Sequence, residues 1–320
     1  MNNTIAHSFL KSALTLENPF ISTDDFLDWL EEKKANVKHK ITPIEFSEMK
    51  HWGFNADTGN LEHESGKFFS IEGIHIKTNW GKVAEWSQPI INQPEVGFLG
   101  IITKKIDGVL YFLMQAKIEP GNINAVQLSP TLQATKSNYT QVHKGNPPLY
   151  LEYFLKERED VTVLLDQLQS EQGARFLKKR NRNIIIEVDG EIEVEEDFCW
   201  LTLGQIKQLL THDNVINMDT RTVISGISFG NLATLSDLSI ANQSAFLQSE
   251  LNQENALHSI EYIISWITKH KSFAELEVKQ IALNSIDDWK KDAASIYHEA
   301  HKYFSVIPAK AEIGNTEVHS

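Results

Sequence analysis

Alternating apolar and polar positions predict several β-strands in the first two thirds of the chain. Apolar-rich runs at 68–76, 96–102, 109–116 and 184–188 have the length and composition of strands. The Asp-Gly pair at 107–108 separates the second and third of these runs. Because Asp-Gly suits the backbone of a tight turn, it predicts a β-hairpin there.

Helical spacing predicts a smaller number of helices beside these strands. The run Thr23-Asp24-Asp25 is typical of a helix start, and Phe26 and Leu30 then fall on one face. A short helix is expected over 203–210, and the mixed segment 160–176 is expected to contain another. Strands with a few interspersed helices indicate the α+β fold class.

The chain contains an internal repeat. Trp29 and Trp266 are separated by 237 positions, and the segments around them match in order. After a slip of two residues the match resumes with the same His, Glu, Lys, Phe and Ser. The alternative is two unrelated amphipathic helices, each followed by a common strand pattern, but ordered matches over this length favour duplication. The paired segments are 26–44 with 263–281, Trp52 with Trp289, and 63–73 with 298–308.

The repeat divides the sequence unevenly. We expect residues 1–227 to form the first unit with an N-terminal helical arm, 228–260 to connect, and 261–320 to begin a second unit. The second copy stops early, so we expect the chain to be less active or less soluble than a complete two-copy form. An interrupted sheet leaves unpaired backbone and an uncovered apolar face.

Composition narrows the class of protein. The chain has 320 residues, a net charge of −13, a pI near 5.4 and one cysteine, Cys199. An acidic chain is a poor partner for nucleic acid or an anionic membrane, because both attract basic surfaces. There is no apolar run of bilayer length and no signal-peptide pattern. We therefore expect a cytoplasmic protein without an internal disulfide.

Two stretches carry candidate binding chemistry. Residues 114–139 are rich in amides and hydroxyls, which suit the many hydroxyl and carbonyl groups of a sugar or nucleotide. Residues 168–183 hold a local excess of cations, which suits a diphosphate. The alternatives are an ordinary solvated loop and a basic surface segment. The cations are Arg175, Lys178, Lys179, Arg180 and Arg182.

Other reaction chemistries have little support in the sequence. His63, His75 and His143 are isolated and lack the spacing of a metal site. Because this spacing is missing, no metal is expected. No glycine-rich phosphate loop and no dinucleotide fingerprint is present, so no Rossmann-bound redox cofactor is expected either. His143 follows the polar stretch and is a candidate base, although a lone histidine more often has a structural role.

The motifs together resemble the NDP-hexose 2,3-dehydratase family of deoxysugar biosynthesis. The resemblance implies a homodimer built from tandem Nudix-like units, each a mixed β-sheet with flanking helices, of which this chain lacks most of the second. The resembling segments are HESGKFFSIEGI (63–74), WSQPIINQPEVGFLGI (86–101), FLMQAKIEPGN (112–122), VQLSPTLQATKSNYTQVHKG (126–145), DQLQSEQGARFLKKRNRN (166–183), FCWLTLGQIKQLL (198–210) and DNVINMDTRTVISGI (213–227).

The metal-binding Nudix signature is incomplete. Its nearest window is DQLQSEQGA at 166–174, where Glu171 and Gly173 fit but Ser170 replaces a glutamate. Asp166-Gln167 also stands where the signature has Arg-Glu. Too few carboxylates remain to hold a divalent metal for pyrophosphate cleavage. The pattern favours binding a nucleotide sugar without hydrolysing it.

The family reaction removes water from dTDP-4-keto-6-deoxyglucose to give a 3,4-diketo-2,6-dideoxy sugar nucleotide. The resemblance implies an NDP-hexose 3-ketoreductase acting next, on the labile product. It also implies the ligand residues Trp52, Thr135, Lys136, Ser137, Asn138, Tyr139 and Ser170, with Trp289 as the repeat mate of Trp52. Arg180 and Arg182 are the diphosphate candidates. Tyr139, His143, Glu119 and Glu171 are the candidates for proton transfer.

Alternative interpretations stay open at this point. Trp52 and Trp289 could instead be core residues, and Arg180 or Arg182 could brace the loop. The chain could be a Nudix-like binder of nucleotide sugars without turnover, or a Nudix hydrolase. Release of dTMP in the presence of magnesium would favour the hydrolase.

Overall fold

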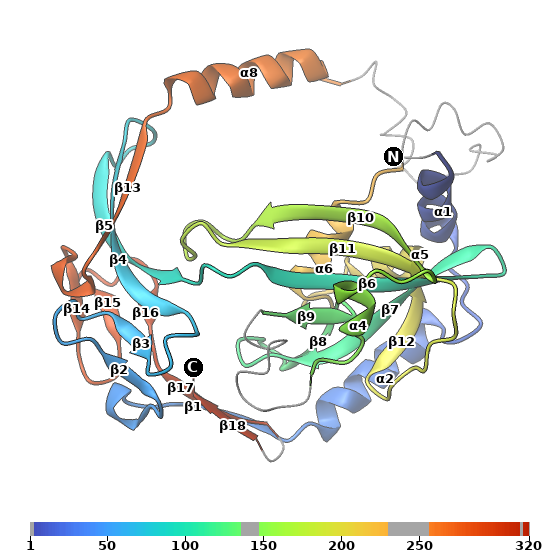
Figure 1. The fold of residues 1–320 in the computed structure, drawn as a ribbon, viewed down its shortest axis with the longest axis horizontal. Helices are drawn as coiled ribbons and strands as arrows, with labels where there is room; N and C mark the ends of the chain where they lie inside the picture. Colours follow the sequence, from blue (N-terminus) through green and yellow to red (C-terminus); the bar gives the residue numbers. More distant parts are fainter. Residues whose placement is uncertain (1–2, 136–146, 230–255, 314–315, 320) are drawn as a thin grey trace.

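The computed structural model describes residues 3–135, 147–229, 256–313 and 316–319. The described chain forms two bodies, a main sheet with its helices and a smaller lobe of short sheets (Figure 1). The α+β class predicted from the sequence is therefore confirmed.

The main sheet has the strand order β10-β11-β6-β7-β12, with β8 beside β7 and β9 beside β6. The pairs are antiparallel except for β11 with β6, so the sheet is mixed. The hairpin predicted at 107–108 is confirmed, because β6 and β7 pair directly across it. The strands are β6 Gly97–Ile106, β7 Val109–Ile118, β8 Val126–Ser129, β9 Leu132–Ala134, β10 Val161–Ser170, β11 Arg180–Val188 and β12 Phe198–Thr202.

Both faces of the main sheet are covered. Apolar side chains of one face, such as Phe112 and Ile185, pack with Phe9 and Phe26 from the helices in one buried core. The opposite face packs under the short α4, where Phe154 is buried. The helices of this body are α1 Asn3–Leu14, α2 Thr23–Asn36, α4 Glu152–Leu155, α5 Leu203–Leu209 and α6 Met218–Ser225.

One sequence prediction was wrong. The segment 160–176 contains strand β10, not a helix. Its register shifts between Val163 and Leu165 at a β-bulge. The bulge interrupts the apolar–polar alternation, so two neighbouring leucines point to the same core and the pattern imitates a helix.

The small lobe is built from both copies of the repeat. The first copy gives β1 His39–Pro43, η1 Phe46–Glu48, β2 Trp52–Phe54, β3 Leu61–His63, β4 Ser70–Thr78 and β5 Glu85–Asn92. The second gives β13 Leu276–Ile281, η5 Leu283–Ser285, β14 Trp289–Lys291, β15 Ile296–His298, β16 Ser305–Val306, β17 Ala309–Ile313 and β18 Thr316–His319.

The two copies exchange strands with each other. Strand β13 of the second copy pairs with β4 of the first, and β1 of the first pairs with β17 of the second. The two pairings have equivalent registers: Leu276 opposes Thr78, and its repeat mate His39 opposes Ile313. The small lobe therefore has internal twofold pseudosymmetry.

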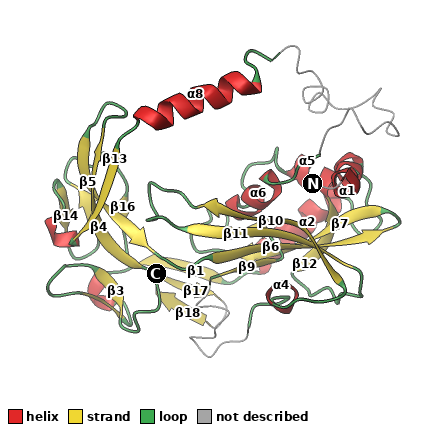
Figure 2. Ribbon diagram, turned by 45° about the horizontal axis from the view of Figure 1, so that its top comes forward, coloured by secondary structure: helices red, strands yellow, loops and turns green. Residues whose placement is uncertain are grey.

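Helix α8, Ile260–Phe273, is the repeat counterpart of α2. It has the same length as α2 and a serine at its start that accepts a hydrogen bond from a backbone N–H in the first turn. Its side chains are exposed, whereas α2 buries Phe26 and Leu30. Figure 2 shows α8 projecting from the small lobe, which it meets at its C-terminal end, where the His270 ring lies 5.0 Å from that of Trp80.

Candidate functional site

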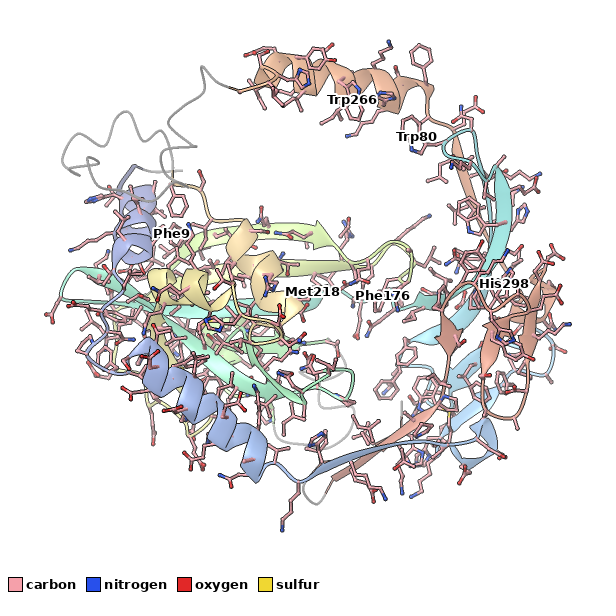
Figure 3. The ribbon with its side chains drawn as sticks, turned by 180° about the vertical axis from the view of Figure 1, so that it is seen from behind. Phe9, Trp80, Phe176, Met218, Trp266 and His298 are labelled. Atoms are coloured by element: carbon pink, nitrogen blue, oxygen red, sulfur yellow. The ribbon has the colours of Figure 1, made fainter. Side chains whose placement is uncertain are left out.

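A cluster of polar and charged side chains lies at one end of the main sheet, beside the start of α6. Lys117 lies near the end of β7, Glu119 directly follows that strand, and Gln133 comes from β9. Glu171 follows β10, and Asp219 lies in the first turn of α6. Met218 and Phe176, on the side facing the small lobe, mark the position in Figure 3.

Amide groups fix the carboxylates of this cluster. Gln133 Nε2 donates to Glu119 Oε1 at 2.6 Å, and Asn217 Nδ2 contacts both Glu119 Oε2 at 3.4 Å and Gln133 Oε1 at 3.2 Å. Asn181 Nδ2 donates to Glu171 Oε2 at 2.8 Å. Asn217 also caps α6, because its Oδ1 accepts from the Thr220 N–H at 2.8 Å. The cap residue therefore ties the helix start to the carboxylate.

The electrostatics of the cluster favour a proton on Asp219. Burial, together with the negative charges of Glu119 and Glu171, raises the pKa of the Asp219 carboxyl to about 7, against the opposing effect of Lys117. Burial lowers the pKa of the Lys117 ammonium, while Glu119 and Asp219 oppose that change. A carboxyl that titrates near neutral pH can give or take a proton during a reaction.

A first cavity, lined by Trp52, lies in the small lobe. Its volume is about 260 Å³. Trp52 is half-buried on β2 and packs against Phe69, with ring centroids 4.7 Å apart. Arg175, from the β10–β11 connection, also lines this cavity, so the main sheet body reaches it. The cavity is mainly apolar, and its dimensions suit an aromatic ring.

A second cavity is lined by Trp289, the repeat mate of Trp52. Its volume is about 730 Å³, and it includes His75, Lys82 and Trp86 from the first copy. The Trp289 Nε1–H donates to the Ser87 carbonyl at 3.0 Å. Phe304 lines both cavities, so the two adjoin.

The aromatic groups around the two tryptophans have nearly the same geometry. Trp52 meets His63 edge-on at 5.3 Å and 84°, and Trp289 meets His298 at 5.6 Å and 85°. Trp289 lies 5.2 Å from Phe304, the repeat mate of Phe69. Equivalent packing of equivalent residues is what a duplicated unit gives.

Three of the residues expected to bind ligand lie on the β10–β11 hairpin. Ser170 and Arg180 are directly opposite each other at the end where the 171–179 connection joins the two strands, and both are exposed. Arg182 is instead paired with Asp166, with contacts of 2.7 and 2.5 Å from Nε and Nη2. Its guanidinium also lies over the Phe98 ring. Arg182 therefore braces the sheet in this structure.

The two segments expected to share the site meet across strand β6. The backbone of Ala134 and the side chain of Asn181 both approach Gly97, where an added Cβ would stand 2.7 Å from Asn181 Oδ1. Thr135 follows β9 at the same edge. The other expected residues of this loop, Lys136, Ser137, Asn138, Tyr139 and His143, lie outside the described residues.

Sequence reasoning named Glu119 and Glu171 but missed Lys117, Asn217 and Asp219. The available signal was the Asn-Met-Asp sequence at 217–219, which fits a helix cap followed by an acidic first turn. That signal predicts a helix start, but the burial that changes the pKa of Asp219 depends on strands distant in sequence.

Within the described ranges, no group of three or more His, Cys, Asp or Glu side chains is arranged to hold a metal ion. No helix in that part of the chain is both long and apolar enough to cross a membrane.

Comparison with known proteins gives consistent matches over nearly the whole chain. A family model described as NDP-hexose 2,3-dehydratase matches residues 23–227 and 260–320. A dTDP-4-dehydro-6-deoxy-alpha-D-glucopyranose 2,3-dehydratase of Saccharopolyspora spinosa is 46% identical over 322 residues, covering 100% of this chain and 65% of the relative. Proteins of the same name from Amycolatopsis orientalis and Streptomyces violaceoruber are 41% and 40% identical, covering 96% and 93% of this chain and 62% and 65% of theirs. The chain thus spans less than two thirds of the length of these relatives.

Solved structures similar to this one include two hydrolases. A C. elegans Ap4A hydrolase has a TM-score of 0.24 at 12% identity, covering 37% of this chain and 87% of its own. An ADP compounds hydrolase has a TM-score of 0.32 at 11% identity, covering 59% and 90%.

Proposed function

Because the chain belongs to the NDP-hexose 2,3-dehydratase family, we propose that it forms the part of a sugar-nucleotide 2,3-dehydratase that binds dTDP-4-keto-6-deoxyglucose and eliminates water from it. The product is a 3,4-diketo-2,6-dideoxy sugar nucleotide. The observation that carries the proposal is the 40–46% identity to three relatives named for this reaction, extending over at least 93% of the chain.

The reaction needs a base and an acid but no net oxidant. The C4 ketone acidifies the C3–H bond, so a base takes that proton and its electron pair enters an enolate. The electron pair of the enolate then forms the C2=C3 bond as the C2–O bond breaks. The C2 hydroxyl leaves as water after receiving a proton, and the resulting enol becomes the 3,4-diketone when C2 is protonated and the C3 hydroxyl loses its proton.

The polar cluster offers groups suited to these steps. Asp219 holds a proton near neutral pH, which fits the acid that protonates the departing hydroxyl. Glu119 and Glu171 are the candidates for the base, and their amide partners Gln133 and Asn181 hold them in place. Tyr139 and His143, which lie outside the described residues, stay candidates for either role.

The nucleotide end of the substrate fits the small lobe. We place the base against Trp52, in a cavity of about 260 Å³ that suits one aromatic ring. The sugar then extends toward Ser170, Arg180 and the polar cluster. Ser170 and Arg175 are five residues apart, so the chain between them spans at most about 17 Å. This limit is compatible with an extended sugar nucleotide.

Two further parts of the proposal concern partners. A homodimer is proposed, and a 3-ketoreductase is proposed to act on the product, because a vicinal diketone is labile and a reductase removes its reactive carbonyl. The Trp289 cavity is proposed as a second place for the nucleotide, since its aromatic geometry matches that of the Trp52 cavity.

The test is to incubate the purified chain with dTDP-4-keto-6-deoxyglucose, a 3-ketoreductase and NADPH. We expect a trapped 2-deoxy sugar nucleotide, identified by mass spectrometry as loss of one water followed by gain of two hydrogens. A reaction in deuterium oxide should place deuterium at C2, because the solvent protonates the enol.

A variant of the polar cluster, a variant outside it and a longer form of the protein complete the test. Asp219→Asn should retain dTDP binding but lose most turnover, whereas Asp213→Asn, on the exposed turn before α6, should retain both. Substrate that stays intact with the wild-type chain and with a longer form carrying a complete second copy would defeat the proposal. Release of dTMP with magnesium would favour a hydrolase instead.

A further inference from the structure

The connection between β10 and β11 carries one arginine out of the main sheet body and into the small lobe. The Ile91 N–H of β5 donates to the Arg175 carbonyl at 2.8 Å, and the Leu177 N–H donates to the Ile91 carbonyl at 2.8 Å. Gln88 Nε2 donates to the Ala174 carbonyl at 2.9 Å. These bonds on both sides of Arg175 fix its backbone against strand β5.

The neighbouring cations of this segment are differently placed. Lys179 is buried, and its ammonium donates to the Glu95 carbonyl at 2.7 Å. Arg182 is held by Asp166 in a two-contact ion pair. Lys178 and Arg180 are exposed, and neither lines the Trp52 cavity. Of the five cations in the segment, Arg175 is the one in the wall of that cavity.

The guanidinium of Arg175 stands at the aromatic wall. Its Cζ lies 5.9 Å from the centroid of the Phe304 ring, and the side chain is exposed. It forms no ion pair with the described residues. An exposed cation at the edge of an apolar cavity attracts an anion that is attached to an apolar or aromatic group.

We propose that Arg175 binds the diphosphate of the nucleotide whose base occupies the Trp52 cavity. The inference rests on the proposed function. It assigns the diphosphate to Arg175, whereas the sequence had indicated Arg180 and Arg182. A cavity of about 260 Å³ has room for a base, so the phosphates lie at its mouth. The guanidinium can then donate two parallel hydrogen bonds to phosphate oxygens.

Binding measurements with ligands of increasing charge test this assignment. Titration calorimetry gives the dissociation constants of thymidine, dTMP and dTDP for the wild-type chain and for Arg175→Gln, Arg175→Lys and Lys178→Gln. The last variant is a matched control, because it removes an equal charge from the same connection at a residue outside the cavity. Circular dichroism and the thermal midpoint confirm that each variant is folded.

We expect Arg175→Gln to weaken dTDP binding by about tenfold to a hundredfold, the range of a lost charge-assisted hydrogen bond. Thymidine affinity should not change, and dTMP should show an intermediate effect. Arg175→Lys should restore part of the loss, because it returns the charge without the planar fork. Lys178→Gln should resemble the wild type. The salt dependence of dTDP binding should also decrease in Arg175→Gln.

Three results would overturn the inference. Equal effects of Arg175→Gln and Lys178→Gln would mean that only the net charge matters. Equal losses of thymidine and dTDP would mean that Arg175 only shapes the cavity. A wild-type chain that binds no dTDP would defeat both the inference and the proposed function. Arg175-dependent dTDP binding without dehydration would support the inference and leave the proposed reaction as the part that fails.

Discussion

At the scale of single residues, Asp219 is the group whose surroundings change its chemistry most. Its carboxyl is half-buried at the start of α6, between two carboxylates and one ammonium. Glu119 and Glu171 face it from β7 and from the end of β10, and Lys117 faces it from β7. With two negative neighbours and one positive neighbour, the neutral form of Asp219 is favoured in the folded protein.

The pKa of Asp219, about 7 in the folded chain, lies above its value of about 4 in the unfolded chain. The folded state therefore binds more protons between pH 4 and 7, and this group contributes less stability as the pH rises through that window. We expect Asp219→Asn, which stays neutral, to equal the wild type near pH 4. At pH 8 it should be more stable by about 2 kcal/mol, a value reduced for partial exposure.

Urea denaturation at intervals from pH 4 to pH 8 measures this difference. Asp213→Asn is the control, because Asp213 lies on an exposed turn. A stability difference between Asp219→Asn and the wild type that does not change with pH would show that the carboxyl keeps its ordinary pKa.

Part of this cluster could be predicted from the sequence. Glu119 and Glu171 stand in polar stretches that already indicate a binding surface, so they were identified. Asp219 was not, because its altered chemistry comes from strands β7 and β10, which lie far from it in the sequence. Arg182 was a reasonable diphosphate candidate by charge, but its pairing with Asp166 follows from the strand register, which the sequence alone does not specify.

At the scale of elements, helices α2 and α8 show one sequence pattern in two environments. Leu30 of α2 is 0% exposed, whereas its repeat mate Ile267 of α8 is 40% exposed. Trp266, also on α8, is 51% exposed. Helix α2 was predictable from its cap and spacing, and α8 from its match to α2 in the repeat. Burial was not, because it depends on whether another element covers the apolar face.

The same truncation at equivalent positions should therefore have different effects. We expect Leu30→Ala to lower the free energy of unfolding by about 3 kcal/mol, because it leaves a cavity in the main core. Ile267→Ala should change it by less than about 0.5 kcal/mol, because the side chain lies on the uncovered face of α8. Urea unfolding followed by circular dichroism measures both, and equal losses would show that the face of α8 is covered in solution.

The exposed apolar face of α8 has a second consequence. Ile263, Trp266 and Ile267 form a continuous patch of the kind that promotes self-association. We expect Ile263→Lys to reduce the apparent mass in concentration-dependent light scattering without lowering the thermal midpoint. Substituting Lys38, an exposed cation beyond the end of α2, by Gln serves as a surface control. Unchanged scattering of Ile263→Lys would show that the patch does not associate.

At the scale of the whole molecule, the exchanged strands join the two copies into one folded unit. The end of strand β4 has β13 as its partner on one edge and β5 on the other. The repeat itself was visible in the sequence through Trp29 and Trp266, Trp52 and Trp289. The exchange was not, because equivalent strands have the same pattern whether they pair within a copy or between copies.

Gly73 is the place to test this joining. It lies on β4 opposite Ile281 of β13, and a Cβ added there would stand 2.7 Å from Ile286 Cγ2 and 2.8 Å from the Ala282 carbonyl. Because Ile281, Ala282 and Ile286 all belong to the second copy, we expect Gly73→Ala to strain the junction between the copies and lower the free energy of unfolding by about 2 kcal/mol. Gly53→Ala, on β2 with no atom within 4 Å of the new methyl, is the matched control and should change it by less than about 0.5 kcal/mol.

If the copies unfold as one unit, the circular dichroism and tryptophan fluorescence transitions of Gly73→Ala should shift together, and trypsin should cleave after the lysines of β13 and β14 more quickly. Separate transitions, or an unchanged midpoint, would mean that the second copy folds independently of β4.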